Sequence, residues 1–172
     1  NIVDKEKEIN QTSLLANVSK TLSETRNGIH LFDMLHCMRG SDDITYVHSI
    51  NVSLICNVFG HWLKLSDKDI EVLTLCGLLH DVGKLKLPHE ILYKEEYEIV
   101  KSHPLEGYDV LKDKDLDQRV KNAAYMHHER CDGSGYPRKL QGEQIDSFAK
   151  IVAIADVYDA MTSARVYRPA LS

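Results

Sequence analysis

Apolar residues recur with helical spacing along almost all of the chain, and this periodicity constrains the fold more than any other feature. In the clearest stretch, residues 45–65, the positions Val47, Ile50 and Leu54 lie three and four residues apart. This spacing places apolar side chains on one face of an α-helix, whereas a half-buried strand would need apolar and polar residues in alternation. Residues 69–80 are strongly apolar, which is typical of a central, buried helix. The pattern predicts an all-α fold in which a sheet is not expected.

Turn formers and helix caps divide the rest of the chain into segments. Two more helices are expected to start at Pro88 and at Pro104. Further helices are expected over 5–38 (one or two helices), over 116–129 and over 146–163. Between the last two, a run of turn formers cannot be regular structure, so a loop is predicted at Asp132-Gly133-Ser134-Gly135-Tyr136-Pro137.

Composition excludes several classes of protein. The 172 residues suffice for one domain with a hydrophobic core. A net charge of −5 provides no basic field for DNA or RNA, so a phosphate-bearing ligand must be held locally by a metal or a few cations. The four cysteines form no C-x-x-C pair, which disfavours a zinc ribbon or disulfide framework and predicts a reducing cytoplasm as the location. No apolar run approaches the ~20 residues that span a bilayer, and the sequence shows no signal-peptide pattern.

The nine histidines of the chain are arranged in a way that predicts a metal site. Taken singly, each has an ordinary role as a capping, solvent-facing or satisfied core residue. Taken with two aspartates that follow apolar helical segments, five of them form a mixed nitrogen and oxygen set, which suits iron, manganese or zinc rather than calcium. The set is His48, His80, His103, His127, His128, Asp81 and Asp156.

The charge of this set is suited to two divalent ions. Two aspartates (−2) and two divalent ions (+4) leave about +2, which attracts a hydroxide and a phosphodiester anion together. Asp81 has two oxygens and is able to hold both ions, and Lys84 follows on the same helical face. Phosphodiester hydrolysis is the reaction class that these residue types indicate.

Taken in chain order, the segments around these residues resemble the HD-GYP subgroup of the HD phosphohydrolase superfamily. The matching stretches occur in the family's order at 45–49, 78–84, 102–104, 127–137 and 155–168. The resemblance implies an HD-domain-like helical bundle with a metal site between helices. It also implies hydrolysis of a cyclic dinucleotide, such as cyclic di-GMP to pGpG and often onward to GMP, at a centre that commonly holds iron or manganese.

By matching position, the resemblance implies a role for each ligand. His48, His80, Asp81 and Asp156 would hold one metal ion, and Asp81 would bridge to a second ion. The ligands of that second ion would be His103, His127 and His128.

The resemblance also implies catalytic and substrate-binding residues. Asp81 and Lys84 would be catalytic, and Lys84, Arg165 and Arg168 would contact phosphate or guanine. The loop beside the site would be shaped by Gly133, Gly135, Tyr136 and Pro137. Ordinary alternatives are a tight turn for the loop, a cation at a helix C-terminus for Lys84, and a solvated face for the arginines. For Glu129, a role in orienting a ligating histidine is one of two open interpretations.

The sequence departs from the family pattern at three places. Some members with three metals have a glutamate one turn before the first histidine, but Ile44 stands there, so two divalent ions, iron or manganese, are expected. A short Lys-Pro-Gly-rich loop is missing between Tyr93 and Glu95, by deletion or because a segment was left out of the chain. The chain ends at Ser172, where the family continues with further helices.

The predicted organisation has two parts. Residues 1–40 are expected to be a helical segment that links to an absent upstream domain or packs on the core, and 41–172 to be an HD-GYP domain truncated at its C-terminal end. Expected partners are a cyclic dinucleotide, an upstream sensory or receiver domain, diguanylate cyclase-type proteins and a second copy in a homodimer. Two other functions stay open: a non-catalytic sensor or docking module, and an HD phosphohydrolase for another nucleotide. The complete ligand set disfavours the first, and the intact Gly-Tyr-Pro segment disfavours the second.

Overall fold

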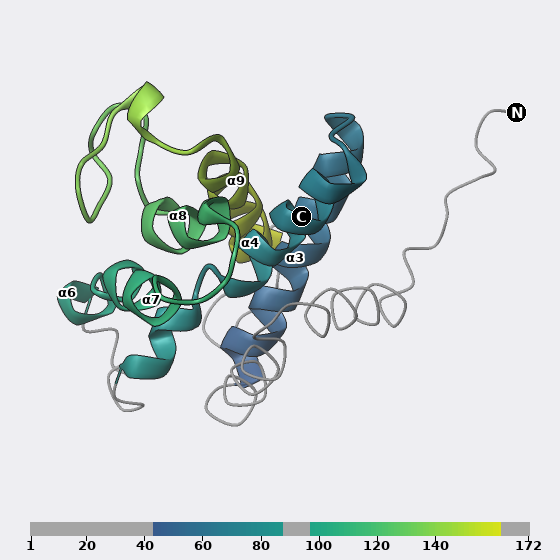
Figure 1. Cartoon of the computed structure of the whole chain (residues 1–172). Helices are drawn as coiled ribbons and strands as arrows, with labels where there is room; N and C mark the ends of the chain where they lie inside the picture. Colours follow the sequence, from purple (N-terminus) through teal and green to yellow (C-terminus); the bar gives the residue numbers. More distant parts are fainter. Residues whose placement is uncertain (1–42, 88–96, 163–172) are drawn as a thin grey trace, which may run out of the picture.

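A computed structural model of the chain describes residues 43–87 and 97–162. The described ranges contain helices and an isolated β-bridge between Asp132 and Gln141, but no sheet. The elements are α3 (Asp43–Trp62), α4 (Asp67–Leu79), the 3₁₀ helix η1 (Val82–Lys86), α6 (Tyr97–Val100), α7 (His103–Leu111), α8 (Gln118–Met126), the 3₁₀ helix η2 (Gly142–Gln144) and α9 (Ser147–Thr162) (Figure 1). The predicted all-α fold is confirmed for these ranges. None of their helices is long and apolar enough to cross a membrane.

Helix α4 is the centre of the bundle, as its apolar sequence predicts. It packs against α3, α8 and α9 (Figure 1). Its side chains Leu73, Leu78 and Leu79 are fully buried. The helix begins at Ser66, whose hydroxyl accepts a hydrogen bond from the backbone N–H of Asp69 and so satisfies one free donor of the first turn. Since α4 is enclosed on several sides, residues at its C-terminal end are delivered into the protein interior.

The other predicted helices are found with one important difference in length. Helix α7 has Pro104 in its first turn, and α9 coincides with the predicted segment 146–163. Helix α8 ends at Met126 rather than at 129, because the backbone N–H of Glu129 donates to the carbonyl of Met126 in a tight terminal turn. The predicted segment 5–38 and the predicted helix start at Pro88 lie outside the described residues.

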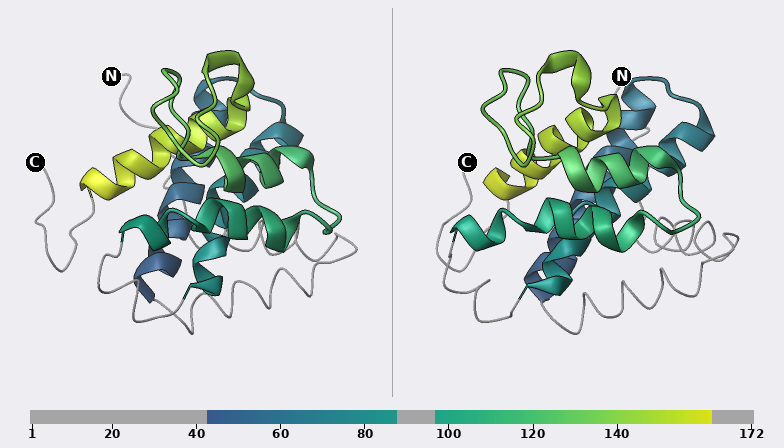
Figure 2. Two further views of the ribbon diagram at one scale, coloured as in Figure 1. Left: turned by 90° about the vertical axis from the view of Figure 1, so that its left-hand side faces the viewer. Right: turned by 60° about the vertical axis from the view of Figure 1, so that its left-hand side comes forward.

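Beyond α8 the chain makes a long connection that stands away from the helices. Residues 127–146 extend from the bundle at the top of both views in Figure 2, and they include the predicted loop. The connection is fixed to the bundle by a small apolar cluster of Leu140, Ile145 and Ala149, against which Met126 packs. It leaves the helices directly after the tandem histidines and returns at the start of α9.

The segment that follows α4 lies unusually close to α7. A Cβ atom on Gly83 in η1 would overlap the carbonyl oxygen of His103 and the backbone nitrogen of Gly107. Only glycine allows this approach, which brings the N-terminal end of α7, and with it His103, up to the end of α4.

We predict that Gly83→Ala destabilises the fold by about 3 kcal/mol, because the added methyl group meets backbone atoms that cannot move independently. Urea unfolding followed by circular dichroism would measure the change in the free energy of unfolding. Gly142→Ala is the matched control, since nothing lies within 4 Å of a Cβ placed there. Equal stability of the two variants would show that η1 and α7 are not held as closely as described.

Candidate metal centre

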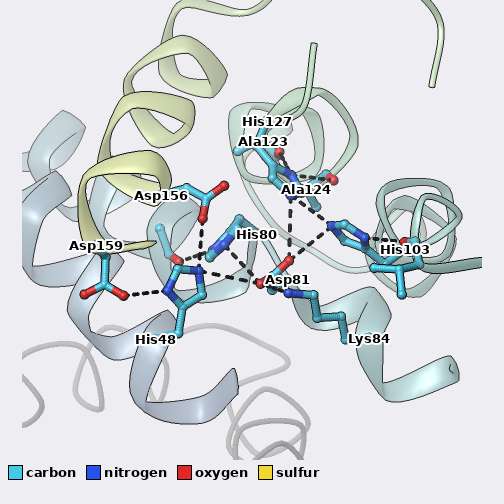
Figure 3. A network of polar contacts seen from close by, with 12 residues as sticks. His48, His80, Asp81, Lys84, His103, Ala123, Ala124, His127, Asp156 and Asp159 are labelled. Carbon is cyan, nitrogen blue, oxygen red and sulfur yellow. Dashed lines mark hydrogen bonds and ion pairs between the residues drawn. The ribbon is translucent and has the colours of Figure 1, made fainter. Parts of the chain in front are cut away.

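The candidate centre begins at the junction between α4 and η1. His80 caps the C-terminal end of α4, and Asp81 caps the N-terminal end of η1, so the chain changes helical geometry between them. Adjacent side chains on one continuous helix point about 100° apart, but at this junction both point into the same space (Figure 3). Both side chains are almost completely buried, at 0% and 2% exposure.

The carboxylate of Asp81 lies between two sets of imidazoles (Figure 3). Its Oδ2 atom is 3.3 Å from Nε2 of His80 and 3.8 Å from Nε2 of His48. Its Oδ1 atom is 3.1 Å from Nε2 of His103 and 3.7 Å from Nε2 of His127. One oxygen therefore faces each set, which is the arrangement that a bridging carboxylate requires.

All seven predicted ligands meet at this place, and they divide into two groups. We name as the first group His48, His80 and Asp156, and as the second group Asp81, His103, His127 and His128. Within each group, the atoms able to bind a metal lie within 4.8 Å of one another. In the first group, His48 lies on α3 and Asp156 lies on α9. In the second group, His103 lies on α7, and His127 and His128 directly follow α8.

Three of the imidazoles are fixed by backbone carbonyls of the preceding turn. Nδ1 of His80 donates to the carbonyl of Gly77 (2.7 Å), and Nδ1 of His103 donates to that of Val100 (2.6 Å). Nδ1 of His127 is 3.0 and 3.1 Å from the carbonyls of Ala123 and Ala124 (Figure 3). A carbonyl oxygen only accepts hydrogen bonds, so Nδ1 must carry the proton and the Nε2 lone pair is left for the site.

These lone pairs fit a bound cation. Among the described residues, no hydrogen-bond partner reaches the buried Nε2 of His80. The Nε2 atoms of His103 and His127 lie 3.1 Å apart, although each already has its proton on Nδ1. Two facing acceptors at that distance repel each other unless a positive charge is placed between or beside them. The donor set is therefore able to bind divalent metal.

Comparison with known proteins agrees with this geometry. The chain matches the HD domain family over residues 10–172. The chain belongs to the HD-domain family. The resemblance to the HD-GYP subgroup is supported by cyclic dinucleotide phosphodiesterases that are more than a third identical to this chain where they align.

Three relatives illustrate the similarity. A cyclic di-GMP phosphodiesterase of Pseudomonas aeruginosa is 39% identical over 138 residues, which are 76% of this chain and 33% of that protein. A 3′3′-cGAMP-specific phosphodiesterase of Vibrio cholerae is 39% identical over 145 residues, 81% of this chain and 34% of that protein. A cyclic di-GMP phosphodiesterase of Thermotoga maritima is 36% identical over 132 residues, 72% of this chain and 36% of that protein. The HD domain thus spans about a third of the length of these curated relatives.

His48 is held by side chains rather than by the backbone. Its Nδ1 donates to Oδ2 of Asp159 (2.6 Å), and its Nε2 lies 3.0 Å from Oδ1 of Asp156 (Figure 3). Burial opposes a charge on this imidazole, but the two carboxylates outweigh burial and raise the pKa of His48 to about 9. Sequence reasoning did not assign a role to Asp159. Its spacing of three residues from Asp156 on an apolar helix was the available signal, because it places both carboxylates on one face of α9.

Three further candidate ligands, Asp81, His127 and His128, are held in the protonation states that metal binding needs. Burial would raise the pKa of Asp81, but Lys84, with Nζ 2.6 Å from Oδ2, holds that pKa well below its usual value. Burial and the neighbouring imidazoles hold the pKa of His127 well below its ordinary value. Burial likewise lowers the pKa of His128 to about 3. At neutral pH the carboxylate is therefore ionised and these two imidazoles are neutral.

The predicted loop lies beside the second group. Gly135 is buried, Gly133 has a φ of +80°, and the ring of Tyr136 stacks on His128. Pro137 is exposed and follows a cis peptide bond. Arg165 and Arg168 lie outside the described residues.

Glu129 does not orient a histidine in this structure. Its Oε1 accepts from the backbone N–H of Arg138 (2.7 Å), and its Oε2 accepts from that of Leu140 (2.9 Å). Both oxygens therefore bind the part of the loop that returns toward the helices, at Arg138 and Leu140. The other residue of note is Ile44, whose apolar side chain is 54% exposed one helical turn before His48.

We predict that Asp159→Asn lowers the pKa of His48 in the metal-free protein and weakens one metal site by about tenfold, because the anionic partner of Nδ1 is lost. Histidine ring NMR would report the pKa, and calorimetric titration with Mn²⁺ would report the affinity. Asp109→Asn on α7 is the matched control, since Asp109 pairs with the exposed Lys112. Unchanged values in the Asp159 variant would mean that the contact has no influence on His48.

We predict that metal binding at the first group is the more dependent on pH. His48, with a pKa of about 9, carries a proton at neutral pH that a metal ion at Nε2 must displace, whereas His127 and His128 have none to lose. Affinity at the first group should fall by about tenfold per pH unit as pH drops below 9. Mn²⁺ titrations between about pH 6 and 8, in buffers of different ionisation enthalpy, would measure both affinity and released protons. Identical pH dependence of the two sites would contradict this assignment.

Proposed function

We propose that this HD domain hydrolyses the phosphodiester bonds of a cyclic dinucleotide, with cyclic di-GMP as the substrate and pGpG, followed by GMP, as products. The observation that carries the proposal is the buried carboxylate of Asp81, which has one oxygen toward each of two groups of metal-binding atoms. The relatives are named as cyclic di-GMP and 3′3′-cGAMP phosphodiesterases, which supports the same reaction class. Because the chain spans about a third of those proteins, the activity of the whole protein is part of the proposal.

The proposal assigns the metal ligands as two sets that share Asp81. His48, His80 and Asp156 would hold one divalent ion, and His103, His127 and His128 the other. When bound, two such ions, iron or manganese, would supply Lewis-acid stabilisation of the phosphoryl oxygens and an activated water nucleophile. Ile44 offers no further ligand at the head of α3, which supports two ions rather than three.

Lys84 is proposed to act on the substrate rather than on the metals. Its ammonium group contacts Asp81 and its side chain is 24% exposed, so it lies between the buried cluster and the solvent. A cation in that position is able to donate to a phosphate oxygen and to stabilise the charge that develops there. Asp81 and Lys84 are therefore the proposed catalytic pair.

Substrate contacts beyond Lys84 are proposed on two further segments. Arg165 and Arg168 would bind the second phosphate or a guanine, and the loop residues Gly133, Gly135, Tyr136 and Pro137 would form a wall beside the second group. An upstream sensory or receiver domain, a cyclase-type partner, a homodimer and a cytoplasmic location also belong to the proposal.

A second candidate substrate is 3′3′-cGAMP, because more than one relative carries that specificity in its name. The two substrates differ in one base, so the phosphodiester chemistry of Asp81 and Lys84 would be the same for both. Parallel assays with cyclic di-GMP and 3′3′-cGAMP would separate the two possibilities, and a chain that binds either nucleotide without turnover would be a sensor.

We predict that Asp81→Ala abolishes both the binding of two metal ions and hydrolysis, while Lys84→Ala keeps both ions and loses about a hundredfold in kcat. Chromatography of the products and elemental analysis of anaerobically prepared protein would give turnover and metal content. Lys86→Ala on the same 3₁₀ helix is the matched control, since Lys86 is exposed. Full turnover by the Asp81 variant would refute the site, and metal loss in the Lys84 variant would refute the role given to that lysine.

A further inference from the structure

His128 is held differently from the other imidazoles of the candidate centre. His48, His80, His103 and His127 each have Nδ1 in a hydrogen bond that sets the orientation of the ring. Within the described part of the chain, the contacts of the His128 ring are with other rings. It lies 4.2 Å from His127 and 5.0 Å from His103, and it stacks on Tyr136 at a centroid distance of 4.8 Å.

The stack on Tyr136 is the most parallel of these ring contacts. The planes of His128 and Tyr136 are inclined by 21°, whereas those of His128 and His103 are inclined by 89°. Near-parallel rings at this distance attract through dispersion and complementary charge distribution. A ring lying flat on the imidazole also prevents its rotation about the Cβ–Cγ bond.

The loop folds back so that Tyr136 lies beside His128. The backbone N–H of Tyr136 donates to the carbonyl of His128 at 3.2 Å. One residue earlier, a Cβ on Gly135 would lie 2.5 Å from Cα of Glu129, so only glycine allows the two strands of the loop to approach this closely. Glu129 then binds the backbone N–H groups of Arg138 and Leu140 and closes the loop.

A second contact ties the tyrosine to the other side of the site. Nζ of Lys101 lies 5.8 Å from the centroid of the Tyr136 ring, within the range of a cation–π interaction. Lys101 precedes His103 by two residues, so the tyrosine touches the segments that carry both His128 and His103.

We propose that Tyr136 is a positioning residue for His128: its aromatic ring fixes the plane of the imidazole so that a ring nitrogen faces the second group. The stack takes the place of the Nδ1 hydrogen bond found at the other four histidines. This role depends on one part of the proposed function, namely that the second group holds a metal ion. It differs from the substrate contact implied by the family resemblance, because a substrate contact would change KM and leave metal affinity unchanged.

The test compares three variants of the full chain. Tyr136→Phe keeps the ring and removes the hydroxyl, and Tyr136→Leu removes the ring while keeping an apolar side chain. Tyr125→Leu is the matched control, because among the described residues the ring contact of Tyr125 on α8 is with Tyr108, at 5.1 Å and a tilt of 35°. Calorimetric titration of the metal-free proteins with Mn²⁺ resolves the two sites.

Tyr136→Leu is expected to weaken one of the two Mn²⁺ sites by about tenfold and to leave the other unchanged. The Phe variant and the Tyr125 control should bind both ions as the wild type does. Wild-type affinities in Tyr136→Leu would overturn the proposal, and so would an equal loss in Tyr136→Phe, which would assign the effect to the hydroxyl.

A second measurement does not depend on metal. In the metal-free wild type, the carbon-bound ring protons of His128 should be shifted upfield by the ring current of Tyr136. The shift should persist in Tyr136→Phe and vanish in Tyr136→Leu, and its absence from the wild type would overturn the stack itself. If the wild type binds two Mn²⁺ ions but hydrolyses no cyclic dinucleotide, the proposed function fails and the positioning role stands. A wild type that binds no ion at the second group overturns both.

Discussion

The buried carboxylate of Asp81 is the constraint around which the rest of the structure is arranged. A charge with 2% exposure is costly unless cations and hydrogen-bond donors surround it. Lys84 supplies one positive charge at 2.6 Å, and the imidazoles on both sides supply nitrogens that are able to bind a metal rather than apolar packing. Because α3, α7, α9 and the residues directly after α4 and α8 each contribute a member of the two groups, the packing of the bundle and the geometry of the site cannot vary independently.

The way each imidazole is held suggests how the site keeps its shape. His80, His103 and His127 are fixed by carbonyls three or four residues earlier, so their orientation follows from the backbone of their own helical turn. His48 depends instead on Asp159 of another helix, and His128 on a ring brought back by a loop. Each proposed metal therefore has candidate ligands that are fixed by their own helical turn and one that depends on another helix or on a loop. The distant supports couple α9 and the 127–146 connection to the geometry of the centre.

Residue types and helical periodicity were sufficient to predict the buried α4, the seven residues of the two groups and the loop at 132–137. They were insufficient where an outcome depended on contacts between distant segments. The sequence favoured a helix through Glu129, but the loop binds Glu129 from the other side, and the helix ends at Met126. Asp159 was passed over because a carboxylate on a helix gives no sign of its partner until α9 is packed against α3.

The sequence by itself determined the chemistry that is available: an apolar helical framework, five imidazoles, two carboxylates and a lysine at fixed positions along the chain. Those properties are local, since side-chain type and periodicity do not depend on what lies nearby in space. Only the tertiary structure decided how the candidate ligands divide into two groups, which nitrogen of His80, His103 and His127 faces the site, and that Tyr136 lies on His128. The division into groups depends on helix packing, which brings together residues up to 111 positions apart, as for His48 and Asp159. The stack on His128 depends instead on how the 127–146 connection folds back.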